Sequence, residues 1–181
     1  FSNKNKLLFI DCGCNYGFYS LYTSSLNSTN IVIAIEASKI TSNEFIKNLK
    51  LNNSSNINFY NNAVSNINDQ KIIFNESNND WESSQIHSNF DLNSRTKIKS
   101  VKIDRLLSGY NLKNYKTIIK LDVEGNEVKA IIGALEFIKK SSPLIIIEFS
   151  KYTFENLDNI DHLKNFLLKY EYSIYNTKKK K

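Results

Sequence analysis

Short apolar runs alternate with segments of helical periodicity along this chain, and no other feature of the sequence restricts its fold as much. Strands that are buried on both faces read as continuous apolar runs, and such strands belong to parallel sheets. Right-handed crossovers through helices leave few arrangements of that sheet. The sequence therefore predicts an α/β fold with a doubly wound, mostly parallel sheet. The predicted strands are residues 7–11, 31–37, 57–64, 117–123 and 144–150.

Helical patterns separate these strands. They predict helices over residues 16–26, 41–51 and 126–140, a short helical turn over 103–107, and a last helix near 160–170. Thr41 and Glu44 have capping-box spacing at the start of the second helix. Residues 172–175 are a candidate final strand, whose exposed edge would favour association with another chain, such as a homo-oligomer.

The region from about residue 66 to 102 departs from this pattern. Two stretches with period-2 alternation, KIIFNES and KIKSVKI, flank a polar loop that contains Trp81, Ser83, Ser84 and His87. Alternation of this kind is typical of antiparallel strands. We expect a β-hairpin-like insertion in the otherwise parallel fold.

The length of 181 residues suits one domain, which we place at residues 1–177. The net charge of +6 owes four charges to the terminal lysines 178–181, predicted to be a frayed basic tail, and the remainder carries +2. So small an excess does not indicate a nucleic-acid partner. No apolar run is long enough for a membrane span.

Cys12 and Cys14 lie too close together for an unstrained disulfide, which favours free thiols in a reducing, cytoplasmic compartment and no zinc site.

The turn after the first strand, LLFIDCGCNYGFYS, holds two of the five glycines in the chain. A glycine turn between strand and helix allows a ligand to approach the backbone closely. The dinucleotide pattern G-x-G-x-x-G is absent, because Asn15 stands where its second glycine would be. The acid Asp11 before Gly13 would repel a pyrophosphate and suits a ligand with an ammonium group.

Glu36 ends the second predicted strand, where an acidic side chain can accept hydrogen bonds from both hydroxyls of a ribose. One acid for an amine and another for a ribose fit S-adenosylmethionine better than NAD.

Five blocks of the sequence, in order, resemble the FkbM-type methyltransferases: DCGCNYGFYS, IEA, NNAVS, IKLDVEGNE and PLIIIE. The resemblance extends from about residue 7 to 148. It implies a Rossmann-like, S-adenosylmethionine-dependent enzyme that methylates a hydroxyl of a sugar, a glycan or a secondary metabolite. It further implies that a loop of Asp11, Gly13, Asn15 and Gly17 binds the methionine end of the cofactor. It also implies that Glu36 binds the ribose and that Asn62 and Ala63 contact the adenine.

Three acids follow the later strands and are candidates for contact with the methyl acceptor. Asp122 and Glu124 lie two residues apart, so they share a face if the strand continues. A hydroxyl acceptor gains from a base within hydrogen-bond reach, and Asp122 is the first candidate. Pairing with Lys120 would weaken that role, and either acid could instead cap the next helix. Glu148 ends the last predicted strand, and ligands of doubly wound sheets bind in a crevice at these carboxyl ends of the strands. The three acids would hold Mg²⁺ only if they converge, and we expect no metal.

Two alternatives belong to other classes. An RNA methyltransferase would need a basic, aromatic crevice face. A catalytically inactive, cofactor-binding partner subunit is the non-enzyme alternative, because the first strand begins only a few residues into the chain, where many members of the family carry additional helices.

Overall fold

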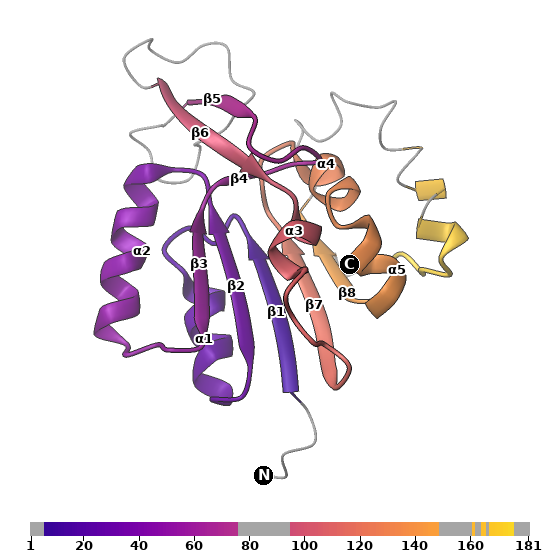
Figure 1. Ribbon diagram of the computed structural model, residues 1–181, viewed down its shortest axis with the longest axis horizontal. Helices are drawn as coiled ribbons and strands as arrows, with labels where there is room; N and C mark the ends of the chain where they lie inside the picture. Colours follow the sequence, from indigo (N-terminus) through magenta and orange to yellow (C-terminus); the bar gives the residue numbers. More distant parts are fainter. Residues whose placement is uncertain (1–5, 76–94, 149–160, 162–163, 166, 176–181) are drawn as a thin grey trace, which may run out of the picture.

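The computed structural model describes residues 6–75, 95–148, 161, 164–165 and 167–175. Its main sheet has five parallel strands in the order β3-β2-β1-β7-β8 (Figure 1). These strands are β1 (Lys6–Cys12), β2 (Ile31–Glu36), β3 (Ile57–Asn61), β7 (Tyr115–Leu121) and β8 (Leu144–Ile147). The order reverses between β1 and β7, so the predicted doubly wound parallel sheet is confirmed.

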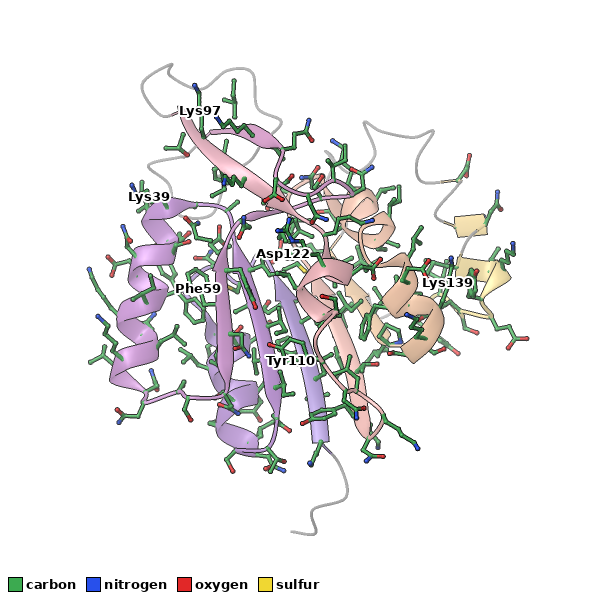
Figure 2. The ribbon with its side chains drawn as sticks, viewed as in Figure 1. Lys39, Phe59, Lys97, Tyr110, Asp122 and Lys139 are labelled. Atoms are coloured by element: carbon green, nitrogen blue, oxygen red, sulfur yellow. The ribbon has the colours of Figure 1, made fainter. Side chains whose placement is uncertain are left out.

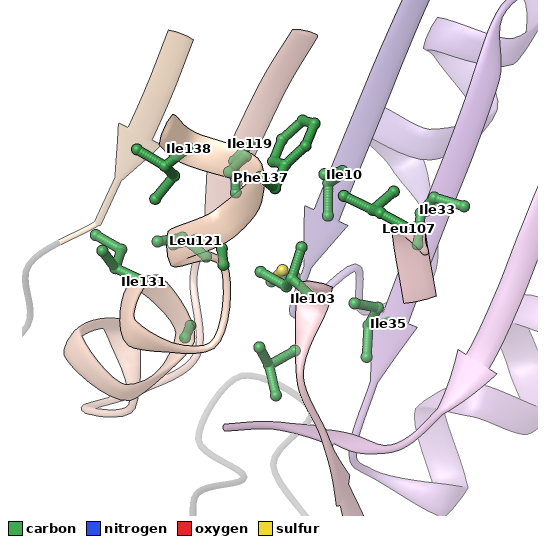
Figure 3. Packing of buried hydrophobic residues seen from close by; sticks show 14 of the residues in the cluster. Ile10, Ile33, Ile35, Ile103, Leu107, Ile119, Leu121, Ile131, Phe137 and Ile138 are labelled. Atoms are coloured by element: carbon green, nitrogen blue, oxygen red, sulfur yellow. The ribbon is translucent and has the colours of Figure 1, made fainter. Parts of the chain in front are cut away.

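Helices pack on both faces of this sheet. On one face, α1 (Phe18–Leu26) and α2 (Lys39–Leu51) enclose a small core around Phe45, whose ring lies 5.0 Å from that of Phe59 in an edge-to-face arrangement. On the other face, α3 (Ile103–Leu107), α4 (Glu127–Ile132) and α5 (Leu135–Ser141) cover the larger cluster that Figure 3 shows. Successive side chains of β1 point to opposite faces of the sheet, and the alternate residues Leu8, Ile10 and Cys12 all pack into the larger cluster.

The insertion forms a second, three-stranded sheet in the order β4-β6-β5. Its strands are β4 (Ala63–Val64), β5 (Lys71–Asn75) and β6 (Arg95–Val101). The two predicted strands β5 and β6 pair antiparallel, as expected, and this sheet lies across the carboxyl ends of the main strands (Figure 1). The polar loop with Trp81, Ser83, Ser84 and His87 falls outside the described residues, as does the tail 178–181.

The predicted single helix over residues 126–140 is wrong, because the structure divides it into α4 and α5. The break is at Gly133, where a Cβ atom would lie 2.2 Å from the Ser65 carbonyl oxygen. Asp104 then caps α5 from outside, because its carboxylate accepts hydrogen bonds from the backbone N–H groups of Glu136 and Phe137 at 3.1 and 2.9 Å.

Three smaller expectations also need correction. The strand predicted over 57–64 ends at Asn61, because its neighbour β2 ends at the paired residue Glu36 and offers no further backbone partner. The cap of α2 is Ser38, whose hydroxyl accepts from the Thr41 N–H, and not Thr41 itself. Residues 172–175 form no strand; the Tyr172 hydroxyl donates instead to the Pro143 carbonyl oxygen at 3.0 Å. Of the last predicted helix, the described residues 161, 164–165 and 167–169 are helical.

Candidate functional site

A cavity of about 520 Å³ lies at the carboxyl ends of β1, β2, β7 and β8, with residues of the insertion forming another wall. Its volume is within the range of small-molecule and cofactor sites, and its position is where ligands bind to doubly wound sheets. The lining comes from segments far apart in the sequence: residues 13–16, 18–19, 35–38, 41, 62–64, 74, 120, 122–124, 126 and 148. Figure 2 labels Asp122, which marks this end of the sheet.

Gly13 is where the loops after β1 and β7 touch. Its φ of +73° is in the left-handed region, and an added Cβ would lie 1.8 Å from the backbone oxygen of Asp122. A backbone hydrogen bond from the Asp122 N–H to the Cys12 carbonyl oxygen holds this contact, and the Gly13 N–H donates to the Ile35 carbonyl oxygen of β2 on the other side. The sequence position of this glycine therefore reflects close packing of two backbones beside the cavity.

Gly17 serves the fold on the opposite side of the same turn. It precedes α1 with a φ of +85°, and a Cβ there would lie 1.9 Å from the ring of the fully buried Phe45. Between the two glycines, Asn15 also has positive φ. The Oδ1 atom of Asn15 is buried without a hydrogen-bond partner in the described part of the protein, and the residue lines the cavity.

Glu36 connects this turn to the end of β2. Its carboxylate accepts hydrogen bonds from the Asn15 N–H at 2.9 Å and from the Ser38 N–H at 2.8 Å. Burial raises the pKa of Glu36, although these backbone donors oppose the shift. The Ala37 N–H acts on it in the same way. A carboxylate has about four acceptor positions, so acceptor capacity remains for a ligand hydroxyl.

Asp11 lies directly behind the cavity and does not line it. The carboxylate is 1% exposed, accepts from the Ser20 hydroxyl at 2.7 Å, and lies 3.8 Å from the Lys120 ammonium. Asp11 and Lys120 are register partners of neighbouring strands, so the pairing follows from the alignment of β1 with β7. Burial raises the pKa of Asp11, and Lys120 and Ser20 act against that shift.

Lys120 also pairs with Asp122, Nζ to Oδ2, at 3.0 Å. Its ammonium lies 5.4 Å from the centre of the Tyr19 ring, which is cation–π distance. Burial disfavours the charged form of Lys120, but the carboxylates of Asp11 and Asp122 outweigh that effect and raise its pKa. The cavity therefore contains a fixed ammonium beside a carboxylate.

The loop after β7 does not continue the strand. Glu124 has a φ of +46° and Gly125 a φ of +96°, so the assumption that Asp122 and Glu124 share a strand face is wrong. Glu127, only 1% exposed, holds this loop from below by accepting from the backbone N–H groups of Val123 and Gly125 at 3.1–3.3 Å. We did not predict this role for Glu127.

Eight of the ten residues expected to form the site line the cavity: Gly13, Asn15, Glu36, Asn62, Ala63, Asp122, Glu124 and Glu148. Asp11 and Gly17 lie behind it. Asn62 uses its amide to donate to the Lys99 carbonyl oxygen, which links this wall to the insertion. Among the described residues, no three His, Cys, Asp or Glu side chains are arranged to hold a metal ion, so the three acceptor-side acids do not converge on one.

Cys14 lines the cavity as a buried thiol, and Cys12 is buried beside it; both are free. Burial, followed by the neighbouring carboxylates, raises the pKa of each thiol. Both cysteines are therefore neutral packing residues.

The sequence matches the methyltransferase FkbM domain family over residues 11–174. The chain belongs to the FkbM methyltransferase family. It resembles the crystal structure of a methyltransferase FkbM from Methylobacillus flagellatus with a TM-score of 0.60 and 20% identity, over 93% of this chain and 38% of that one. The chain thus spans well under half of that relative's length.

Two further structures share the fold of this FkbM-family chain. A precorrin-6y C5,15-methyltransferase from Geobacter metallireducens gives a TM-score of 0.51 at 13% identity, over 94% of this chain and 65% of that one. A putative rRNA-methylase from Clostridium thermocellum gives 0.50 at 9% identity, over 90% and 72%. No curated protein matches the chain.

In the part of the chain that the structure describes, no helix is both long and apolar enough to cross a membrane.

Sequence reasoning missed the aromatic side of this FkbM-family cavity. Tyr16, Phe18 and Tyr19 line it, and Phe18 and Tyr19 are 73% and 54% exposed. Their rings meet edge to face at 5.4 Å. The signal in the sequence was the aromatic run at the end of the glycine turn, where three aromatic residues fall within positions 16–19.

Proposed function

We propose that this chain is an S-adenosylmethionine-dependent methyltransferase that acts on a hydroxyl of a sugar, a glycan or a secondary metabolite. The observation that carries the proposal is a row of polar groups across the carboxyl ends of neighbouring strands. In the strand order, Asn62 follows β3, Glu36 ends β2, Gly13 follows β1, Asp122 follows β7 and Glu148 follows β8.

This row suits the length and chemistry of the cofactor. Neighbouring strands lie about 4.8 Å apart, so adenine near Asn62 and Ala63 and ribose at Glu36 direct the methionine portion toward β1 and β7. Glu36 retains acceptor capacity for ribose hydroxyls. The buried, unpaired Oδ1 of Asn15 offers a further acceptor beside the same wall. The donor and acceptor set therefore fits an aminoacyl-nucleoside.

When bound, the cofactor supplies a methyl group on a sulfonium, and the chain's own residues contribute mainly position. Gly13, Asn15 and Gly17 shape the loop, with Asp11 behind it. Glu124 and Glu148 line the far side of the cavity, where they would orient the acceptor hydroxyl or accept its proton. Asp122 remains a candidate for the same work, although one of its oxygens already accepts from Lys120.

The charge of the cavity disfavours RNA as the acceptor. Its described lining carries the carboxylates of Glu36, Asp122, Glu124 and Glu148 against the single ammonium of Lys120. A phosphodiester would be repelled by this excess of negative charge. The same acids distinguish an enzyme from an inactive cofactor-binding subunit, because only an enzyme would need them for turnover.

We also propose a reducing, cytoplasmic setting, which the two free cysteines support.

Calorimetric titration of S-adenosylhomocysteine tests the cofactor class. We expect the parent to bind and Glu36→Ala to bind at least tenfold more weakly, about 1.4 kcal/mol. Glu44→Ala, on the exposed side of α2, is the matched control and should bind like the parent. NAD titrated in the same buffer should give no heat of binding. Binding of NAD, or no binding of S-adenosylhomocysteine to a folded parent, would contradict the proposal. Screening of neutral hydroxyl acceptors would follow.

A further inference from the structure

Lys120 and Asp122 place opposite charges side by side in the wall of the cavity. Their Nζ and Oδ2 atoms are 3.0 Å apart, and both residues line the cavity. The side chain of Lys120 is 14% exposed and that of Asp122 is 33% exposed, so both can meet a ligand while their surroundings exclude most water. An α-amino acid zwitterion presents the complementary arrangement, with a carboxylate and an ammonium on one carbon.

Contacts from two other groups fix the position of this pair. Asp11 lies 3.8 Å from the Lys120 ammonium on one side, and the Tyr19 ring lies 5.4 Å from it on another. Lysine normally loses considerable side-chain entropy when it is immobilised, and here that loss is already incurred in the folded protein. An ammonium has three donors, of which Asp122 takes one in the described structure. A ligand carboxylate can therefore be bound without breaking the pair.

The place of the pair in the sheet matches the end of the cofactor that it would bind. Glu36 ends β2, and β7 is two strands away, roughly 10 Å at normal strand spacing. Ribose held at Glu36 leaves the amino acid portion near β1 and β7, where Lys120 and Asp122 lie. Among the described lining residues, Lys120 is the only Lys or Arg.

We propose that the Lys120–Asp122 pair binds the amino acid end of S-adenosylmethionine, with the ammonium of Lys120 on its carboxylate and the carboxylate of Asp122 on its ammonium. The inference rests on the proposed function and assigns a role that the sequence suggested for Asp11. Asp11 does not line the cavity. Its Oδ2 accepts from Ser20, and its Oδ1, which has no hydrogen-bond partner among the described residues, lies 3.8 Å from the Lys120 ammonium, so Asp11 positions the lysine from behind.

The test compares two ligands that differ at this end. S-adenosylhomocysteine carries the amino acid, whereas 5′-methylthioadenosine keeps the adenine, the ribose and the sulfur but lacks it. We expect Lys120→Met to weaken S-adenosylhomocysteine at least tenfold by calorimetry and to change 5′-methylthioadenosine by less than twofold. Asp122→Asn should give the same pattern. Lys116→Met, an exposed lysine on the same strand, should change neither affinity.

Decarboxylated S-adenosylmethionine separates the two halves of the pair. It lacks only the carboxylate, so Asp122→Asn should weaken it whereas Lys120→Met should not. If Lys120→Met does not fold because Asp11 is left buried beside an apolar side chain, the double variant Asp11→Asn/Lys120→Met removes both charges and takes its place.

The inference is overturned if Lys120→Met, or the double variant, weakens both ligands by the same factor or weakens neither. Equal losses would mean that Lys120 only maintains the shape of the site. If the folded parent binds neither ligand, the proposed cofactor class fails first, and the assignment of the pair fails with it. The selective loss of the amino-acid-bearing ligand supports the proposal.

Discussion

Replacing Gly13 with alanine should lower the stability of the fold by an amount that its surroundings define. Two costs add. A non-glycine residue in the left-handed region costs about 1–2 kcal/mol. The new Cβ would also lie 1.8 Å from the Asp122 carbonyl oxygen, whereas ordinary contacts begin at 3.4 Å, and a backbone atom cannot rotate away as a side chain can. Overpacking of this kind costs about 1–3 kcal/mol.

The expected loss in the free energy of unfolding is therefore about 2–5 kcal/mol, roughly 5 to 20 °C in melting temperature for a chain of this size. Urea unfolding followed by circular dichroism measures it. Gly109→Ala is the matched control, because a Cβ there meets nothing within 4 Å and Gly109 has no positive φ. We expect that variant to stay within about 0.5 kcal/mol of the parent. If Gly13→Ala also stayed within that range, the close contact between the β1 and β7 loops would be refuted.

Three further predictions follow from buried charges. Lys120→Met should lower the free energy of unfolding by about 3–5 kcal/mol because it leaves Asp11 unpaired, and Asp11→Asn/Lys120→Met should recover part of that loss; additive losses in urea unfolding would contradict it. Glu127→Gln should cost about 1–3 kcal/mol, since an amide offers one acceptor where two oxygens meet loop N–H groups. Glu44→Gln should cost little, and equal melting temperatures for both would contradict the loop role. Because burial raises the folded-state pKa of Glu36, the folded protein holds a proton that the unfolded chain releases. The contribution of Glu36 to the free energy of unfolding is present in full below the unfolded pKa near 4.5 and is lost as pH rises through the folded pKa. As the pH is raised from about 4.5, the parent should therefore lose more stability than Glu36→Gln; parallel melting profiles would contradict this.

The main sheet was predictable because its central strands β1 and β2 are buried on both faces. Residues 31–35, for example, are apolar throughout, and no exposed face interrupts the pattern. What the sequence could not reveal were partners distant along the chain. Asp104 caps a helix that begins 31 residues later, and the contact of Gly133 with Ser65 spans 68 positions. Both features divide the predicted helix, and neither leaves a local signal.

The candidate site was predictable as far as strand ends determine it. Residues that end or directly follow a strand, such as Glu36 and Glu148, line the cavity because parallel strands end together. The directions of side chains within the turns were not predictable. Asp11 was assigned from its place before the glycine turn and Glu124 from its strand spacing to Asp122. The register of Asp11 with Lys120 and the left-handed conformation at Glu124 decide where each carboxylate lies.

The reversal of strand order between β1 and β7 relates the fold to the chemistry. The two strands are parallel, but the chain crosses over from β1 to β2 on one side and from β7 to β8 on the other, so the loops that follow them separate and open the cavity. The loops still touch at one point, Gly13 against the Asp122 carbonyl, and the residue that supplies this carbonyl also carries the carboxylate of the charged pair. Any side chain at position 13 would displace Asp122 and with it Lys120. The absence of a Cβ at Gly13 therefore does more than admit a ligand to the backbone: it fixes the distance between the turn that shapes the cavity and the charges that line it.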